Sequence, residues 1–310
     1  MGKQFGSGIN ELMKGDVMFS FLLKNLDADG RCAGADHRRA RENAKETVTR
    51  QWVRCGLAAF AAMFAANVHS ETCPQLAALG LTDANLKSAL RAVVPASGTP
   101  NGGLGFPMWL TLVDGSGIVC SVTNSLDGSA NNADVTADIW LGSRVISAQK
   151  ANAANAFSNG RLALSTANLY SAVQPGGSLY GLQASNPVDA TVAYDGRAAD
   201  FGTPKDPLVG SRVGGINVFG GGLALYNNGR KLGAIGVSGD TSCTDHVVAW
   251  KVRVATTFAG VPAFGSFDKM FQDITDNPNG GTGISASGFG HPKCLFNPTQ
   301  AQAGGSIIGN

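Results

Sequence analysis

Residues 214–253, GGINVFGGGLALYNNGRKLGAIGVSGDTSCTDHVVAWKVR, carry the clearest pattern of strands and turns in this chain. Three short apolar runs, 216–219, 223–226 and 232–237, are predicted to be strands. Glycines separate the first two runs, and Asn-Asn-Gly at 227–229 separates the second from the third. That tripeptide is typical of a tight hairpin turn. The segment therefore predicts an antiparallel sheet with a glycine corner.

A helix is predicted to follow the turn Ser238-Gly239-Asp240. Several residues can cap its N-terminus, namely Thr241, Ser242 and Thr244. Free backbone N–H groups and the helix dipole favour ligand binding where a strand end meets a helix start. His246 lies one turn into this helix. We therefore expect any small-molecule site to be built around this turn.

Composition limits the classes of protein that this chain can represent. It has 310 residues, of which 44% are hydrophobic and 15% are charged, with 42 glycines, which suits one or two globular domains. Residues 71–310 hold 14 Lys/Arg and 15 Asp/Glu. A body so close to neutral, with no basic cluster, argues against nucleic acid as a partner.

The N-terminal part has the pattern of an export signal. A basic region precedes the apolar run 55–66, and small residues follow at Val68 and Ser70. This arrangement predicts a signal peptide over 48–70, and the run is too short to form a stable membrane span. The alternative is a buried core helix. We expect a periplasmic or secreted protein.

Residues 1–47 do not fit that signal, because signals start close to the initiating methionine. One interpretation is an extension that is not native, with the true start near Val48. An unusually long basic region of the signal is the alternative. In either case we expect one domain over 71–310.

Four cysteines follow the predicted signal. An even number in an exported chain indicates two disulfides, for which three connectivities are possible. We favour Cys243–Cys294 and Cys73–Cys120. Because no Cys-x-x-Cys occurs, a zinc or thioredoxin-like site is not indicated.

The other expected elements, in chain order, alternate helices with one further hairpin. They are a helix over 83–94, a hairpin of 108–113 and 118–122, a helix over 145–157, a short helix over 165–174, a long loop over 186–213 and a loop-like tail from 260. No internal linker is long enough to divide the body.

These residues resemble a known family. The order of DGSGIVC, RVISAQKANAANAFS and KLGAIGVSGDTSCTDH is similar to the GlcG/HbpS-like family of haem-binding or haem-degrading domains. The resemblance covers a core of about 76–260 and leaves a tail, 261–310. It implies a profilin-like α/β (α+β) fold, with an antiparallel sheet of about five strands flanked by helices. It also implies homo-oligomers and a haem or related tetrapyrrole cofactor.

Two histidines are candidates for the axial ligand of a haem iron. His246 lies beside the glycine-rich turn, and the alternative for it is a structural role near the helix start. His291 can approach the same site if Cys294 pairs with Cys243. Gly214, Gly215, Gly239 and Asp240 are further candidates to bind the cofactor, on the surface that extends from Gly214 to His246.

Acidic and basic candidates remain beside the histidines. Asp240 is a candidate acid/base group, and with His246 it forms the candidate catalytic pair; a helix cap is its alternative. Lys205 and Arg212 are candidates to meet carboxylates such as haem propionates, with solvated surface charge as the alternative.

Three functions stay open at this point. The first is an exported binding protein for haem or a similar planar small molecule. The second is an accessory protein or enzyme of periplasmic small-molecule oxidation. The third is a structural, self-assembling protein.

Overall fold

The computed structural model describes residues 71–126, 135–262, 265–274 and 283–308. The predicted signal and the extension before it lie outside these residues. The chain divides between Val68 and His69, and every described residue belongs to the unit His69–Asn310.

A four-stranded antiparallel sheet forms the centre of this unit, in the order β2-β1-β5-β4. Its strands are β1 (Trp109–Asp114), β2 (Val119–Asn124), β4 (Gly222–Asn227) and β5 (Arg230–Ser238). Both predicted hairpins are present. In the second, Asn228 and Gly229 have φ of 50° and 77°, the two positive values that a tight primed turn requires.

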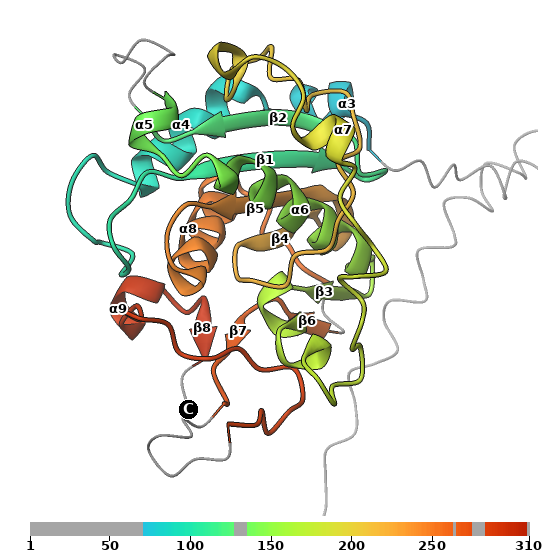
Figure 1. Cartoon of the computed structure of the whole chain (residues 1–310), viewed down its shortest axis with the longest axis vertical. Helices are drawn as coiled ribbons and strands as arrows, with labels where there is room; N and C mark the ends of the chain where they lie inside the picture. The colour runs from blue at the N-terminus through green and yellow to red at the C-terminus, as the bar shows by residue number, and fades with distance from the viewer. Residues whose placement is uncertain (1–70, 127–134, 263–264, 275–282, 309–310) are drawn as a thin grey trace, which may run out of the picture. The chain divides into compact units, whose positions relative to one another are not determined.

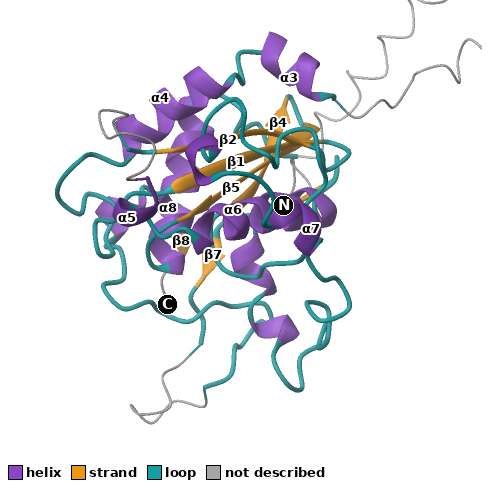
Figure 2. Cartoon of the chain, turned by 45° about the horizontal axis from the view of Figure 1, so that its top comes forward, coloured by secondary structure: helices purple, strands orange, loops and turns teal. Residues whose placement is uncertain are grey.

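Helices cover both faces of the sheet, and Figure 2 shows α4 (Asp83–Val93) and α6 (Gly142–Phe157) on opposite sides of the strands. α8 (Ser242–Ala255) shares the α4 face. The residues at the centre of one apolar core come from these two helices and the sheet: Leu86, Leu90, Leu110, Leu112, Leu223, Ile235, Val248 and Val252. On the other face, alanines of α6 pack against Trp109, Tyr226 and Ala234.

Short elements complete the unit. They are α3 (Cys73–Ala78), α5 (Val135–Asp138), β3 (Leu162–Leu164), α7 (Ala190–Ala193), β6 (Gly265–Phe267), β7 (Met270–Phe271), α9 (Gln300–Ala303), β8 (Ile307–Ile308) and three turns of 3-10 helix at 166–169, 171–173 and 198–200. β3 pairs with β6, and β7 pairs with β8, both in parallel.

The α+β class and the antiparallel sheet flanked by helices are confirmed. The main sheet has four strands among the described residues, rather than about five, because the predicted strand at 216–219 is wrong. Asn217 accepts a hydrogen bond from Phe219 N–H (3.1 Å), and the Thr166 hydroxyl donates to the Phe219 carbonyl (2.5 Å). These local bonds replace the ladder bonds of a strand.

Two smaller predictions also need correction. The segment 165–174 forms two turns of 3-10 helix and no α-helix. The tail contains short strands and a helix, so it is less loop-like than its sequence indicates. None of the helices in the described ranges is long and apolar enough to cross a membrane.

A buried ion pair joins the two helical layers at the end of β5. Lys150 of α6 donates to the carboxylate of Asp245 on α8 (2.7 Å) and to the carbonyl of Val237 (3.0 Å). The other carboxylate oxygen of Asp245 accepts the N–H groups of Gly239 and Asp240. Burial lowers the pKa of Lys150 and raises the pKa of Asp245 to about 6, although the attraction between the two opposes both shifts.

We predict that Lys150→Met lowers the free energy of unfolding by about 3–5 kcal/mol, because it leaves a buried carboxylate without its cation. Lys150→Met combined with Asp245→Asn should recover part of that loss, since the remaining partner is then neutral. Urea unfolding followed by circular dichroism measures both. Arg197→Gln, which removes an exposed ion pair, is the matched control and should unfold at the same urea concentration as the wild type. A loss below about 1 kcal/mol for Lys150→Met would contradict this role.

Candidate functional site

His246 is completely buried on α8, with no exposed surface. Its Nε2 lies 3.0 Å from the carbonyl oxygen of Ser306, so Nε2 carries the proton and donates it. Nδ1 then holds a lone pair, for which the described residues provide no hydrogen-bond partner. Burial lowers the pKa of this histidine to about 3. The imidazole is therefore neutral and is enclosed by protein.

His291 lies in the C-terminal segment and is only 2% exposed. Its Nδ1 is 2.7 Å from the carbonyl oxygen of Pro292 and therefore donates, so Nε2 accepts from the Ser242 hydroxyl at 2.8 Å. Burial lowers the pKa of His291 to about 4. This histidine fastens the C-terminal segment to the first residue of α8.

The C-terminal segment, here residues 265–274 and 283–308, covers the face of α8 on which His246 lies. Figure 1 shows β7, β8 and α9 beside this helix. Met270, Ala303 and Ile307 pack against Cys243 and Val247. A buried ion pair between Arg253 and Asp268 (2.7 Å) adds a further attachment.

The structure contains both of the disulfides that we favoured. Cys243 is bonded to Cys294, which ties the C-terminal segment to the start of α8. Cys73 is bonded to Cys120, which ties α3 to β2. His291 lies near the first disulfide and Asp114 near the second, a grouping that could otherwise hold a metal ion. Sulfur atoms joined in a disulfide are not thiolates, so these groups are not metal sites in this structure.

Asp240 acts as an anchor for the loop that precedes β1. Its carboxylate accepts the N–H groups of Leu104 (2.9 Å) and Phe106 (3.1 Å), and also that of Thr241 (2.5 Å). The N-cap of α8 is Thr241. Because these donors surround the carboxylate and only 7% of the residue is exposed, the arrangement favours the structural interpretation of Asp240 over the acid/base one.

The candidate glycines do not gather around His246. Gly214 pairs with Val188 of the long loop, and the carbonyl of Gly215 accepts from Asn152 of α6 (2.8 Å), on the other face of the sheet. Gly239 lies against Pro107 and Met108 near the start of β1. The surface that we expected from Gly214 to His246 is thus split between two layers.

A cleft of about 800 Å³ lies elsewhere, beside α4. Its described lining comes from α4, the loop before β1, the end of β2 and α5: Ala84, Lys87, Ser88, Arg91, Ala92, Val94, Pro95, Ala96, Gly105, Pro107, Ser125, Leu126 and Asp138. We call it the α4 cleft. Its volume falls within the range of about 300–1,000 Å³ that is usual for small-molecule sites.

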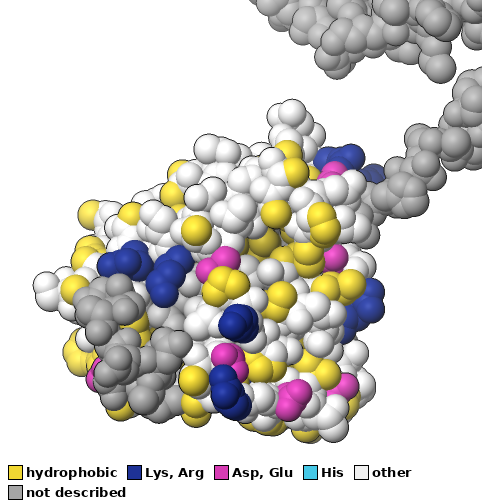
Figure 3. Space-filling model, turned by 90° about the horizontal axis from the view of Figure 1, so that it is seen from above, with side chains coloured by type: hydrophobic (Ala, Val, Ile, Leu, Met, Phe, Trp, Pro, Cys, Tyr) yellow, Lys and Arg dark blue, Asp and Glu magenta, His cyan; other side chains and the backbone are white. Residues whose placement is uncertain are grey.

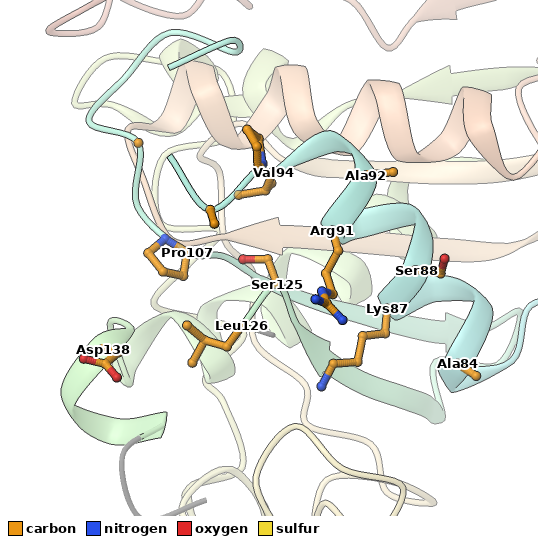
Figure 4. Close-up of a pocket in the computed structure, with 13 residues that line it drawn as sticks. Ala84, Lys87, Ser88, Arg91, Ala92, Val94, Pro107, Ser125, Leu126 and Asp138 are labelled. Atoms are coloured by element: carbon orange, nitrogen blue, oxygen red, sulfur yellow. The ribbon is translucent and has the colours of Figure 1, made fainter. Parts of the chain in front are cut away.

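Basic and apolar groups are separated across the α4 cleft. Lys87 and Arg91 project together from α4 (Figure 4). Asp138 lies on the side of the cleft away from α4, and Leu126 lies between Asp138 and the two basic side chains. Seen from above, Lys and Arg side chains lie beside both acidic and hydrophobic ones on the surface (Figure 3). The exposed rings of Phe106 and Trp140 pack edge to face, with their centroids 4.9 Å apart. In the sequence, both residues lie close to residues that line the α4 cleft.

Sequence reasoning missed the α4 cleft, although one signal was available. Lys87 and Arg91 are four residues apart on a helix whose other side is buried through Leu86 and Leu90. Two like charges at this spacing face the same way and repel. A local pattern does not reveal which loops close around such a pair.

Among the residues that the structure describes, neither location offers an accessible haem iron ligand. At His246 the ring is enclosed, and a side-chain carbon added at Gly220 would already touch the Cβ of His246. In the α4 cleft, no described lining residue is His, Cys, Met or Tyr, the usual axial ligands. The residues do fit an amphipathic planar ligand that needs no bond to iron.

We predict that acid destabilises this protein partly through His291. Its pKa is about 4 when folded and about 6.5 when unfolded, so the unfolded chain binds the extra proton between these values. The stabilisation is fully present above pH 6.5 and is lost as pH falls towards 4. Asp245, with its raised pKa, acts in the opposite direction below pH 6.

The test compares the pH dependence of urea unfolding in wild type and His291→Gln. Over that window the wild-type slope should be steeper by about 1.4 kcal/mol per pH unit. Equal slopes would mean that His291 titrates normally in the folded protein.

We also predict that the C-terminal segment protects His246 from chemical modification. Diethylpyrocarbonate should leave His246 unmodified in the wild type at pH 7, as read by peptide mass spectrometry. Cys243→Ser with Cys294→Ser should make it reactive, because the disulfide anchor is lost. Cys73→Ser with Cys120→Ser is the matched control and should leave it protected. Modification of His246 in the wild type would contradict the burial described above.

Comparisons with known proteins agree with part of the resemblance. Residues 133–253 match the family model described as "Haem degrading protein HbpS-like". An uncharacterised 15.0 kDa protein from the dhaT-dhaS intergenic region of Citrobacter freundii is 36% identical over 84 residues, which are 27% of this chain. That alignment covers 41% of the relative's length.

Two solved structures are also similar. One is the Klebsiella pneumoniae protein ORFY, of the DUF336 family, with 23% identity and a TM-score of 0.36 over 58% of this chain and 88% of that one. The other is a PduOC:haem complex, with 23% identity and a TM-score of 0.36 over 56% and 89%. The HbpS-like resemblance that the sequence predicts is confirmed for residues 133–253, which contain α6, β4, β5 and most of α8.

Proposed function

We propose that this protein binds haem or a similar planar small molecule, and that the ligand occupies the α4 cleft. The α4 cleft is the observation that carries the proposal, because its volume suits such a ligand and its walls combine apolar and basic groups. The family match over 133–253 supports the choice of a haem-type ligand.

The buried histidines support this location indirectly. A ligand at His246 would first have to displace the C-terminal segment, which is held by a disulfide, a buried ion pair and an apolar cluster. The α4 cleft needs no such displacement. Asp240 is surrounded by backbone donors, so we do not adopt the oxidation hypothesis. Export and assembly into homo-oligomers remain predictions from the sequence.

The test is a titration of purified residues 71–310 with haemin, followed in the Soret region. We expect saturable binding, which Ser88→Trp should weaken at least tenfold because the new ring fills the α4 cleft. Ala255→Trp, at an exposed position in the last turn of α8, is the matched control and should bind as wild type does. His246→Gln should also leave binding unchanged.

Two results would count against the proposal. Absence of saturable binding would remove haem as the ligand. Binding that is lost in His246→Gln and retained in Ser88→Trp would move the site to α8.

A further inference from the structure

The pair formed by Lys87 and Arg91 has no acidic partner among the described residues. No ion pair joins either side chain to a described carboxylate. Asp83 lies four residues before Lys87, where it could form a helical ion pair, but its carboxylate accepts from the Ser121 hydroxyl instead (2.8 Å). Within the described ranges, no carboxylate therefore neutralises the charge of this pair.

The placement of the pair favours a ligand with acidic groups at one edge. Residues four apart on a helix have Cβ atoms about 5–6 Å apart, so two carboxylates from one edge of a ligand can reach one cation each. Arg91 can take a carboxylate in a two-point contact, and Lys87 can act as a point charge. A bound dicarboxylate also removes the repulsion between the two cations.

The opposite side of the α4 cleft suits the rest of such a ligand. Pro107 and Leu126 offer apolar contact, and Asp138 on that side would repel a second acidic edge. The neighbouring rings of Phe106 and Trp140 are 37% and 51% exposed, which provides aromatic surface to a flat ligand. These features give the ligand one orientation, with its acids towards α4.

We propose, on the basis of the function given above, that the α4 cleft recognises a planar dicarboxylate through Lys87 and Arg91 and not through a metal bound to the ligand. Ring size and carboxylate position then determine selectivity. A metal-free tetrapyrrole with two propionates should bind as well as its iron complex, because no described residue of the lining is an iron ligand.

The experiment compares four probes on residues 71–310: haemin, iron-free protoporphyrin IX and the dimethyl ester of each. Absorbance reports the iron complexes, and porphyrin fluorescence reports the others. Both free acids should bind with dissociation constants within about threefold of each other. Both esters should bind at least tenfold more weakly.

Variants identify the residues. Lys87→Gln and Arg91→Gln should each raise the dissociation constant of both free acids about fivefold, as expected for a partly exposed ion pair. Lys293→Gln is the matched control, because it removes an exposed lysine from the C-terminal segment, and it should have no effect. The substitutions should not change ester binding, which a general loss of fold would weaken too.

The outcomes separate this inference from the proposed function. If haemin binds but iron-free porphyrin does not, the metal holds the ligand and the inference is overturned. If esterification or the two substitutions change affinity less than twofold, carboxylate recognition is wrong while ligand binding stands. If no probe binds, the proposed function fails and the inference with it.

Discussion

The ion pair between Lys150 and Asp245 connects α6, on one face of the sheet, to α8, on the other. Lys150 projects from α6 past the end of β5 and reaches the first turn of α8. The carboxylate that it meets also holds the backbone of the turn at 239–240. Glycine at 236 lets α6 approach β5 closely enough for this contact, because Ser147 and Ala151 leave no room for a side chain there. The two buried charges are tolerated because each is hydrogen-bonded, Lys150 to two acceptors and Asp245 to three donors.

The turn at 239–240 is connected to the α4 cleft through the loop that precedes β1. Asp240 holds the loop at 104–106, which forms one wall of the α4 cleft. The C-terminal segment supports the same loop, since Gly103 N–H donates to the carbonyl of Phe296 (2.9 Å) and Gln302 donates to the carbonyl of Thr99 (2.8 Å). The disulfide at Cys243 thus holds a segment that braces the cleft wall. Because protein interiors are closely packed, a shift of the C-terminal segment would be transmitted to the loop that it contacts.

Local sequence signals predicted the parts of the fold that depend on local physics. Asn228-Gly229 gives the hairpin turn, and Thr241 caps its helix by accepting a hydrogen bond from the N–H of Thr244. The strand expected at 216–219 fails because its apolar pattern says nothing of the bonds from Asn217 and Thr166 that occupy the backbone. The short strands β7 and β8 depend on pairing across more than 30 residues, which no local pattern specifies.

The candidate site was harder to predict for a related reason. His246 donates to the carbonyl of Ser306, and its helix neighbours Cys243 and Val247 pack against Met270 and Ile307. These partners lie far along the chain, so the sequence neighbourhood of His246 could not reveal its burial. A neutral imidazole near a glycine-rich turn is chemically suited to bind iron, but access to it is a property of the whole fold. The pair Lys87 and Arg91 was visible as a pattern, whereas the cleft beside it is assembled from four separate stretches. Residue types in the sequence indicate which ligands a site can bind. Where the site lies depends on contacts between residues that are distant in the sequence.

The central claim is that the ligand binds beside α4 and not at the buried histidines. Its most direct test is a map of backbone amide chemical shifts of residues 71–310, labelled with nitrogen-15, as iron-free protoporphyrin IX is added. We predict the largest changes at Lys87, Arg91, Gly105 and Leu126, with little change at His246 and Ser306. Changes centred on Gly220, His246 and Ser306, with residues 87–91 unaffected, would contradict the account.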